Sequence, residues 1–296
     1  MIDIDGNKYL DFANHHSTMI VGHNHPGVVQ AIATELQKGL GFGGPTKLEE
    51  EISSEIVSRF PAIEKVRFTN SGTESSLHAT RIVRAHSGKQ KIAKFEGAYH
   101  GSHDAVEVSS APPLNKAGSP EMPNAVPAWP GMSKDSETDI IILPYNDMES
   151  VEAILTENKD EIAGVFYDGR AGMLDIPVEF SKFVRKITKD LGILMIMDEV
   201  VSFRAGVGGY QGYAGIEPDL SIFGKVVGGG LPVGAIGGKS KMMDVVDTTK
   251  ETGAPTVNQS GSFSGNNLTL AAGLATLKAM TPEAYSHLDN ITNQLH

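Results

Sequence analysis

Short apolar runs alternate with helical patterns along this chain, and the alternation restricts its possible folds more than any other feature. Runs of four or five mostly apolar residues occupy 65–69, 91–95, 140–143, 163–167, 193–197, 220–223 and 233–236. Between several of them, as in 151–155 and 180–191, apolar residues recur at three- and four-residue spacing, which predicts amphipathic helices. Short apolar runs fit strands that are buried on both faces. The sequence therefore predicts an α/β fold whose mostly parallel sheet is sandwiched by helices.

Two helices are predicted before the first strand. They are marked by apolar residues at four-residue spacing: Val28, Ile32, Leu36 and Leu40 in the first, and Leu48, Ile52, Ile56 and Phe60 in the second. Thr46 and Glu49 have the spacing of a capping box at the start of the second helix. We also expect a long loop at 112–130, which contains six prolines, and a last helix at 268–280.

The charge balance and the amino-acid usage exclude several classes of protein. Lys and Arg number 25 against 36 Asp and Glu, a net charge of −11, which argues against nucleic acid or an anionic membrane as a partner. No disulfide can form because the chain has no cysteine, which suits a reducing compartment. No apolar run approaches the roughly 18 residues of a membrane span, and no signal peptide is recognisable. We expect a cytoplasmic protein.

Two adjacent carboxylates, Asp198 and Glu199, follow the apolar run 193–197. Acidic groups at the end of a core strand are costly to bury without a partner, so a cation is expected to face one of them. A positively charged heterocycle would satisfy Asp198 equally well. The alternative is structural: Asp198 caps a turn and Glu199 is solvated.

A lysine, Lys225, stands at the end of the run 220–223 and is followed by Gly228, Gly229 and Gly230. Glycines allow a ligand to approach the backbone closely, which makes Lys225 a candidate amine nucleophile. A phosphate-binding P-loop is excluded because Val226 stands where that motif needs Ser or Thr. The alternative is an ordinary surface lysine beside a flexible loop.

A possible anion site follows the run 65–69. Ser71 and Glu74 have capping-box spacing, which needs no ligand. The amides of Gly72 and Thr73 at a helix N-terminus would also bind an anion such as a phosphate. Both interpretations are compatible.

Histidines cluster in three places, and they leave a rival enzyme class open. They are His15-His16, His23-Asn24-His25 and His100-Gly101-Ser102-His103. With Asp104 or Asp198 such residues could bind a metal in a metal-dependent hydrolase. No HExxH-type helix is present, so the prediction is that the chain holds no metal.

Taken jointly, the motifs resemble those of a known family. Five segments occur in the order typical of fold-type I pyridoxal-phosphate enzymes: Ser71-Gly72-Thr73-Glu74, Tyr99-His100-Gly101, Asp198-Glu199-Val200, Gly224-Lys225, and Gly261-Ser262-Phe263-Ser264-Gly265-Asn266. The chain resembles the class III aminotransferases, and most of all their glutamate-1-semialdehyde aminomutase branch. The resemblance extends over essentially the whole chain.

The resemblance implies a role for each matching residue. Lys225 would form a Schiff base with the cofactor pyridoxal 5'-phosphate and shuttle a proton, while Asp198 would keep the pyridine nitrogen protonated. The cofactor-binding set implied is Ser71, Gly72, Thr73, Tyr99, His100, Asp198, Val200, Lys225 and Ser262. In this set Val200 and Tyr99 would pack on opposite faces of the ring. Ser262 would reach the phosphate of a partner subunit, so the resemblance also implies a homodimer with shared active sites.

Three departures from the family pattern stand out. Asp168-Gly169-Arg170-Ala171-Gly172 replaces the usual Glu-Pro after the run 163–167, which leaves open whether Arg170 contacts the substrate. His15-His16 stands where the aminomutase branch commonly has Ser-Trp, so His16 is a second candidate substrate residue. The C-terminal small domain of the family is expected to be missing.

These observations lead to one function and one division of the chain. We expect an N-terminal segment at 1–40 and a pyridoxal-phosphate-binding large domain at 41–296. The expected function is transfer of an amino group from a small amino acid or amine, by a transaminase or an aminomutase, which the sequence does not separate. The alternative is a catalytically incompetent cofactor-binding or dimerisation module.

Overall fold

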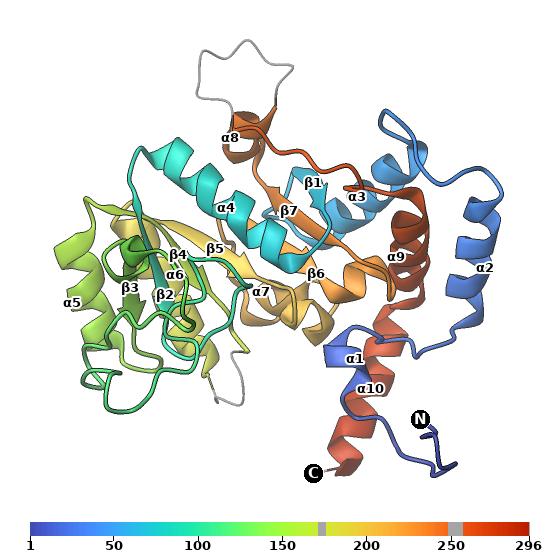
Figure 1. Cartoon of the computed structure of the whole chain (residues 1–296), viewed down its shortest axis with the longest axis horizontal. Helices are drawn as coiled ribbons and strands as arrows, with labels where there is room; N and C mark the ends of the chain where they lie inside the picture. The colour runs from blue at the N-terminus through green and yellow to red at the C-terminus, as the bar shows by residue number, and fades with distance from the viewer. Residues whose placement is uncertain (171–175, 248–256, 296) are drawn as a thin grey trace.

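The computed structural model describes residues 1–170, 176–247 and 257–295, and in these residues a seven-stranded sheet forms the centre of the molecule (Figure 1). Along the chain its strands are β1 (Lys65–Thr69), β2 (Lys91–Phe95), β3 (Ile140–Leu143), β4 (Ile162–Tyr167), β5 (Leu194–Asp198), β6 (Leu220–Gly224) and β7 (Gly234–Gly238). Their order across the sheet is β1-β7-β6-β5-β4-β2-β3. Neighbours from β6 to β3 are parallel, and β7 is antiparallel to both β1 and β6. The prediction of a mostly parallel sheet is confirmed.

Helices cover both faces of this sheet (Figure 1). The α-helices are α1 (Asn14–Ser17), α2 (Pro26–Leu36), α3 (Lys47–Arg59), α4 (Gly72–Ser87), α5 (Met148–Asn158), α6 (Val178–Asp190), α7 (Gly209–Ala214), α8 (Ser240–Met243), α9 (Asn267–Ala279) and α10 (Pro282–Leu295). Short 3-10 helices are η1 (Lys134–Glu137), η2 (Ser202–Ala205), η3 (Lys225–Gly228) and η4 (Asp244–Val246). None of the helices in the described ranges is long and apolar enough to cross a membrane.

The core is divided by the sheet because successive side chains of a strand point to opposite faces. Ile196 of β5 packs on the face covered by α4, together with Ile82 and Val83. Its neighbour Met195 points the other way and packs with Phe180 of α6. This two-sided burial explains why the strand runs are apolar throughout.

The predicted helices before the first strand form, with one difference in length. In α3 the capping box of Thr46 and Glu49 is present, and Ile52 and Ile56 are fully buried. The first helix was expected to include Leu40, but α2 ends at Leu36. Gly39 follows with a φ of 126°, a backbone conformation that ends the helical path.

The proline-rich loop contains no strand or α-helix at 112–130, as predicted. An isolated bridge joins Pro127 of the loop to the buried Val108, and a second, between Gly118 and Pro123, lies within the loop itself. The helix predicted at 268–280 is confirmed as α9, but it is not the last, because α10 follows it. The division of the chain at residues 40 and 41 stays a prediction.

Candidate active site

The carboxyl ends of β4, β5 and β6 open into a cavity of about 450 Å³. Ligands in open α/β sheets bind at this edge. Asp168, Asp198 and Lys225 come from these three strand ends and all line the cavity. The cavity is also lined by eight residues predicted to bind a cofactor: Ser71, Gly72, Thr73, Tyr99, His100, Asp198, Val200 and Lys225. The fold thus gathers residues that lie more than 150 positions apart in the sequence.

One wall of the cavity is the N-terminus of α4. The Ser71 hydroxyl caps the helix by accepting from the amide of Glu74 at 3.1 Å. The Glu74 carboxylate accepts from the backbone amide of Asn70 at 2.8 Å. The amides of Gly72 and Thr73, in the first turn, have no acceptor within the helix. Ser71 therefore caps the helix as predicted, and these two amides can still bind an anion.

Close backbone packing holds this wall against its neighbours. A Cβ added to Gly101, whose φ is 109°, would lie 2.8 Å from the Cα of Thr73. A Cβ added to Gly72 would lie 3.1 Å from Cγ2 of Val200. Glycine at these two positions therefore lets the helix N-terminus, the 99–101 loop and Val200 meet at one cavity.

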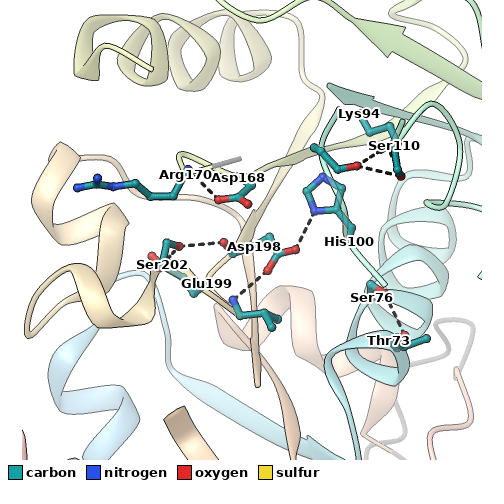
Figure 2. A network of polar contacts seen from close by, with 12 residues as sticks. Thr73, Ser76, Lys94, His100, Ser110, Asp168, Arg170, Asp198, Glu199 and Ser202 are labelled. Atoms are coloured by element: carbon teal, nitrogen blue, oxygen red, sulfur yellow. Dashed lines mark hydrogen bonds and ion pairs between the residues drawn. The ribbon is translucent and has the colours of Figure 1, made fainter. Parts of the chain in front are cut away.

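Asp198 lies at the base of the cavity, only 4% exposed. Its Oδ2 is 2.7 Å from Nδ1 of His100, and its Oδ1 accepts from the amide of Val200 at 2.9 Å (Figure 2). Burial lowers the pKa of His100, against the opposing effect of Asp198, so the neutral imidazole is favoured. The sequence predicted a cation here, but the partner within the described residues is this imidazole. Nε2 of His100 is buried and has no hydrogen-bond partner in the same part of the chain.

Glu199 has a structural role. Its side chain is fully buried and accepts from the Ser202 hydroxyl at 2.6 Å and from the amides of Tyr210 and Gln211 at 3.0 and 2.9 Å. The interpretation that Glu199 is solvated is therefore wrong. Burial raises the pKa of its carboxyl, which the donors oppose. The side chain ties η2 and α7 to the end of β5.

Lys225 begins η3 directly after β6. Its φ is 50°, a left-handed conformation that is uncommon in residues other than glycine and is often found at functional sites. The side chain is half-buried and lines the cavity. A Cβ added to the preceding Gly224 would lie 3.3 Å from Cγ1 of Val200, so β6 and the turn after β5 pack closely. Lys225 thus faces the cavity, and its role as an amine nucleophile rather than an ordinary surface lysine stays a prediction.

A second lysine, Lys94, supports the loop that carries Tyr99 and His100. Its fully buried Nζ donates to the carbonyl oxygens of Ala98 at 2.7 Å and of Val108 at 2.5 Å. Burial lowers its pKa to about 7. The two bonds fix both ends of the loop, a role that the sequence pattern did not indicate.

The segment after β4 departs from the family pattern in an informative way. A Cβ added to Gly169 would lie closer than 3.0 Å to the ring of Tyr210, so no larger residue fits there. The backbone amide of Arg170 donates to Oδ1 of Asp168 at 2.8 Å. The Arg170 guanidinium lies over the ring of Tyr213, 5.7 Å from its centroid, and points away from Asp198 (Figure 2). Arg170 does not line the cavity, and Ala171 and Gly172 lie outside the described residues.

The other predicted residues are placed as follows. His15 and Thr18 line the cavity, whereas His16, the predicted substrate residue, does not. Ser262 is exposed in a turn and does not line the cavity of its own chain. No group of three or more His, Cys, Asp or Glu in the described residues could hold a metal ion.

Comparisons with known proteins relate the chain to one family. Residues 1–295 match the model of the family "Aminotransferase class-III". The chain is similar to a glutamate-1-semialdehyde 2,1-aminomutase from Heliobacterium modesticaldum, with 42% identity over 98% of this chain and 65% of that protein. The chain therefore spans slightly less than two thirds of the length of this curated relative.

Solved structures give the same picture. An ω-transaminase from Sphaerobacter thermophilus superimposes with a TM-score of 0.94 and 38% identity, over 99% of this chain and 67% of that one. A glutamate-1-semialdehyde aminomutase from Pseudomonas aeruginosa in complex with PMP has a TM-score of 0.85 and 28% identity, over 99% and 65% of the two chains.

Proposed function

The chain belongs to the class III aminotransferase family, and from this premise we propose that it moves an amino group with pyridoxal 5'-phosphate as cofactor. The observation that carries the proposal is one cavity that joins a buried carboxylate, Asp198, to a lysine on a strained backbone, Lys225. The family relationship adds support, since the aminomutase from Pseudomonas aeruginosa holds PMP.

The residues present fit this cofactor. The amides of Gly72 and Thr73 would bind its phosphate, since a helix N-terminus favours an anion. Asp198 would hold the protonated ring nitrogen, which supplies the cation that a buried carboxylate requires. Val200 and Tyr99 would lie on opposite faces of the ring, and Lys225 would bind the aldehyde carbon covalently.

Each residue then has one task in the reaction. When bound, the cofactor supplies an electron sink that stabilises negative charge at the substrate α-carbon. Nζ of Lys225 would move the proton between this carbon and the cofactor carbon that carries the transferred amino group. The Asp198 carboxylate would pair with the ring nitrogen. His100 orients that carboxylate through the 2.7 Å contact with Oδ2.

The substrate class we propose is a small amino acid or amine. An aminomutase returns the amino group to the same carbon skeleton, whereas a transaminase releases a keto product. Both begin with the same half-reaction, so both remain within the proposal. We place the protein in the cytoplasm, as its sequence led us to expect.

We further propose a homodimer with shared active sites. Ser262 is exposed in its own chain, which suits a hydroxyl that reaches a partner's phosphate. With cofactor at micromolar protein concentration, light scattering is expected to give twice the chain mass of 31.5 kDa. A value of 31.5 kDa would reject the dimer. Unchanged cofactor affinity in dimeric Ser262→Ala would reject the phosphate contact alone.

Amino-group transfer can be tested with a nitrogen-15-labelled donor. The chain is loaded with pyridoxal phosphate and supplied with labelled amino acids or amines and with keto acids. We expect label on a product amine from the unmodified chain and from Lys239→Ala, a change of a surface lysine that contacts Pro61 and Glu64. Lys225→Ala is expected to transfer none. Cofactor binding without transfer from any donor would instead indicate the incompetent binding module.

A further inference from the structure

Three acidic side chains converge at the ends of β4 and β5, more than the proposed cofactor needs. Tyr167 of β4 pairs with Met197 of β5 in register, and Asp168 and Asp198 directly follow these two residues in the sequence. Asp168 is 7% exposed and Asp198 is 4% exposed, and both line the cavity. Glu199 is fully buried beside them (Figure 2). Three buried carboxylates at one edge of the sheet cannot all be ionised at low cost.

The hydrogen bonds show which of the three carboxyls is least able to hold a charge. Glu199 accepts from Ser202, from the Tyr210 amide and from both the amide and the side chain of Gln211. Asp198 has the Val200 amide on one oxygen and His100 on the other. Asp168 has only the Arg170 amide on Oδ1, and within the described ranges no donor contacts its Oδ2. Since hydrogen bonds stabilise the charged form, Asp168 is the first to take up a proton.

The other groups around Asp168 do not reverse this order. Tyr145 donates its hydroxyl to the backbone carbonyl of Asp168 at 2.9 Å, not to the carboxyl. The Arg170 guanidinium lies over Tyr213, away from the cavity. Lys225 favours the ionised form, but the effects of burial and of Asp198 are larger, and together they raise the pKa of Asp168 to about 8. Across the cavity, His100 is favoured in its neutral form.

We propose that Asp168 is the neutral acid of this cavity: it holds the proton that lets Asp198 stay ionised, and it donates a hydrogen bond from Oδ2 to an acceptor atom of the bound cofactor or substrate. This inference rests on the proposed function for the identity of the ligand. The proton itself depends only on the side chains of the chain. An Asn at this position is then a permanent donor, whereas ionised Asp168 is only an acceptor.

The proton can be observed directly in the cofactor-free chain labelled with carbon-13 at the aspartate carboxyl. One resonance, identified by its loss in Asp168→Asn, is expected to titrate with a midpoint near pH 8. In Asp198→Asn the neighbouring charge is gone, so this midpoint is expected to fall by one pH unit or more. A midpoint below pH 5 in the unmodified chain, or an unmoved midpoint in Asp198→Asn, would overturn the proposal.

A second measurement needs no variant of the site to fold. At pH 6 the unmodified chain is expected to show the infrared C=O band of a protonated carboxylic acid, and this band is expected to disappear by pH 9.5. Asp190→Asn, which removes an exposed carboxylate paired with Lys186, should leave the band unchanged. Absence of the band at pH 6 would contradict a neutral Asp168.

The donated hydrogen bond is tested with pyridoxal phosphate as the probe. The cofactor dissociation constant is measured for the unmodified chain and for Asp168→Asn at pH 7 and at pH 9. The ratio of the first constant to the second is expected to rise several-fold between these pH values, because the aspartate loses its hydrogen-bond donor on ionisation and the asparagine does not. A ratio that stays constant over this range would refute the hydrogen bond. If no variant binds the cofactor at any pH, the proposed function fails, while the carboxyl titration still decides where the proton lies.

Discussion

A single methyl group added at Gly273 is expected to destabilise the protein, although the usual helix preference says the opposite. Gly273 lies in the interior of α9, where replacement of Gly by Ala ordinarily contributes about 0.8–1.0 kcal/mol of stability. In this structure a Cβ there would lie closer than 3.0 Å to the carbonyl oxygen of Val227 in η3, and 3.1 Å from Cδ1 of Ile52. A Cβ on Gly229 would likewise collide with the carbonyl oxygen of Ala272. Helix α9 therefore packs backbone to backbone against the turn that begins with Lys225.

The size of the effect follows from two opposing contributions. Overpacking of a tight core costs about 1–3 kcal/mol. A backbone carbonyl cannot rotate out of the way as a side chain can, so we expect the upper part of that range. Subtracting about 1 kcal/mol for helix preference leaves a net loss of about 1–2 kcal/mol for Gly273→Ala. With an m value near 3 kcal/mol/M, the midpoint of urea unfolding falls by about 0.3–0.7 M.

The assay is urea unfolding of the whole chain, with Gly212→Ala as the matched control. Gly212 lies in α7, is exposed, and would have no heavy atom within 4 Å of an added Cβ. We expect this control to be neutral or to be stabilised by up to about 1 kcal/mol. Gly273→Ala is also expected to weaken cofactor attachment at Lys225, because η3 must move. A midpoint for Gly273→Ala equal to or above that of the unmodified chain would refute the backbone packing inferred here.

The remaining predictions concern the cavity. Asp198→Asn is expected to retain the cofactor but to lower turnover by about 10²–10³-fold, because the charge on the ring nitrogen is no longer stabilised; turnover near the unmodified level in steady-state kinetics would contradict this. We also expect the Thr73 hydroxyl to bind the phosphate beside the two amides, so Thr73→Ala is expected to weaken cofactor binding about 10- to 100-fold and Thr73→Ser to restore it; equal affinities in equilibrium titration would exclude the hydroxyl contact. Between pH 3.8 and about 8 the folded chain keeps a proton on Asp168 that the unfolded chain releases, so stability falls as pH rises through this window. Asp168→Asn is expected to reduce this loss of stability with rising pH. If denaturant titrations give the variant the same dependence of stability on pH, another group is responsible for the loss.

The sheet was predictable because its strands are buried on both faces, and each such strand is a short continuous run of apolar residues in the sequence. Each predicted run coincides with a strand to within two residues, from Lys65–Thr69 to Gly234–Gly238. The helix ending at Leu36 was predicted too long because Leu40 continues the apolar spacing, and spacing does not report the backbone turn at Gly39. Local periodicity thus fixes which elements exist better than where they end.

The site was predictable in its members but less so in its contacts. Lys225 and Asp198 are adjacent to strand ends, where ligands bind in such sheets, so position alone singled them out. The interpretation of Glu199 as solvated was wrong because its hydrogen-bond donors lie on η2 and α7. No short-range sequence pattern connects these elements to Glu199. His15 rather than His16 lines the cavity because residues Asn14 to Ser17 all have positive φ, which side-chain identity does not indicate. The proton proposed for Asp168 could not be predicted from the sequence, because it depends on the position of Asp168 near Asp198 at the ends of two neighbouring strands.

The most direct test of the account is the site of covalent attachment of the cofactor. The whole chain is incubated with pyridoxal phosphate and reduced with borohydride, and its peptides are then mapped by mass spectrometry. The test is demanding because Lys94, with its pKa lowered to about 7, has an easily deprotonated amine, although it is fully buried. We predict modification at Lys225 and none in Lys225→Ala. Modification at Lys94, at Lys239, or at many lysines without preference would contradict the assignment of this cavity as the cofactor site.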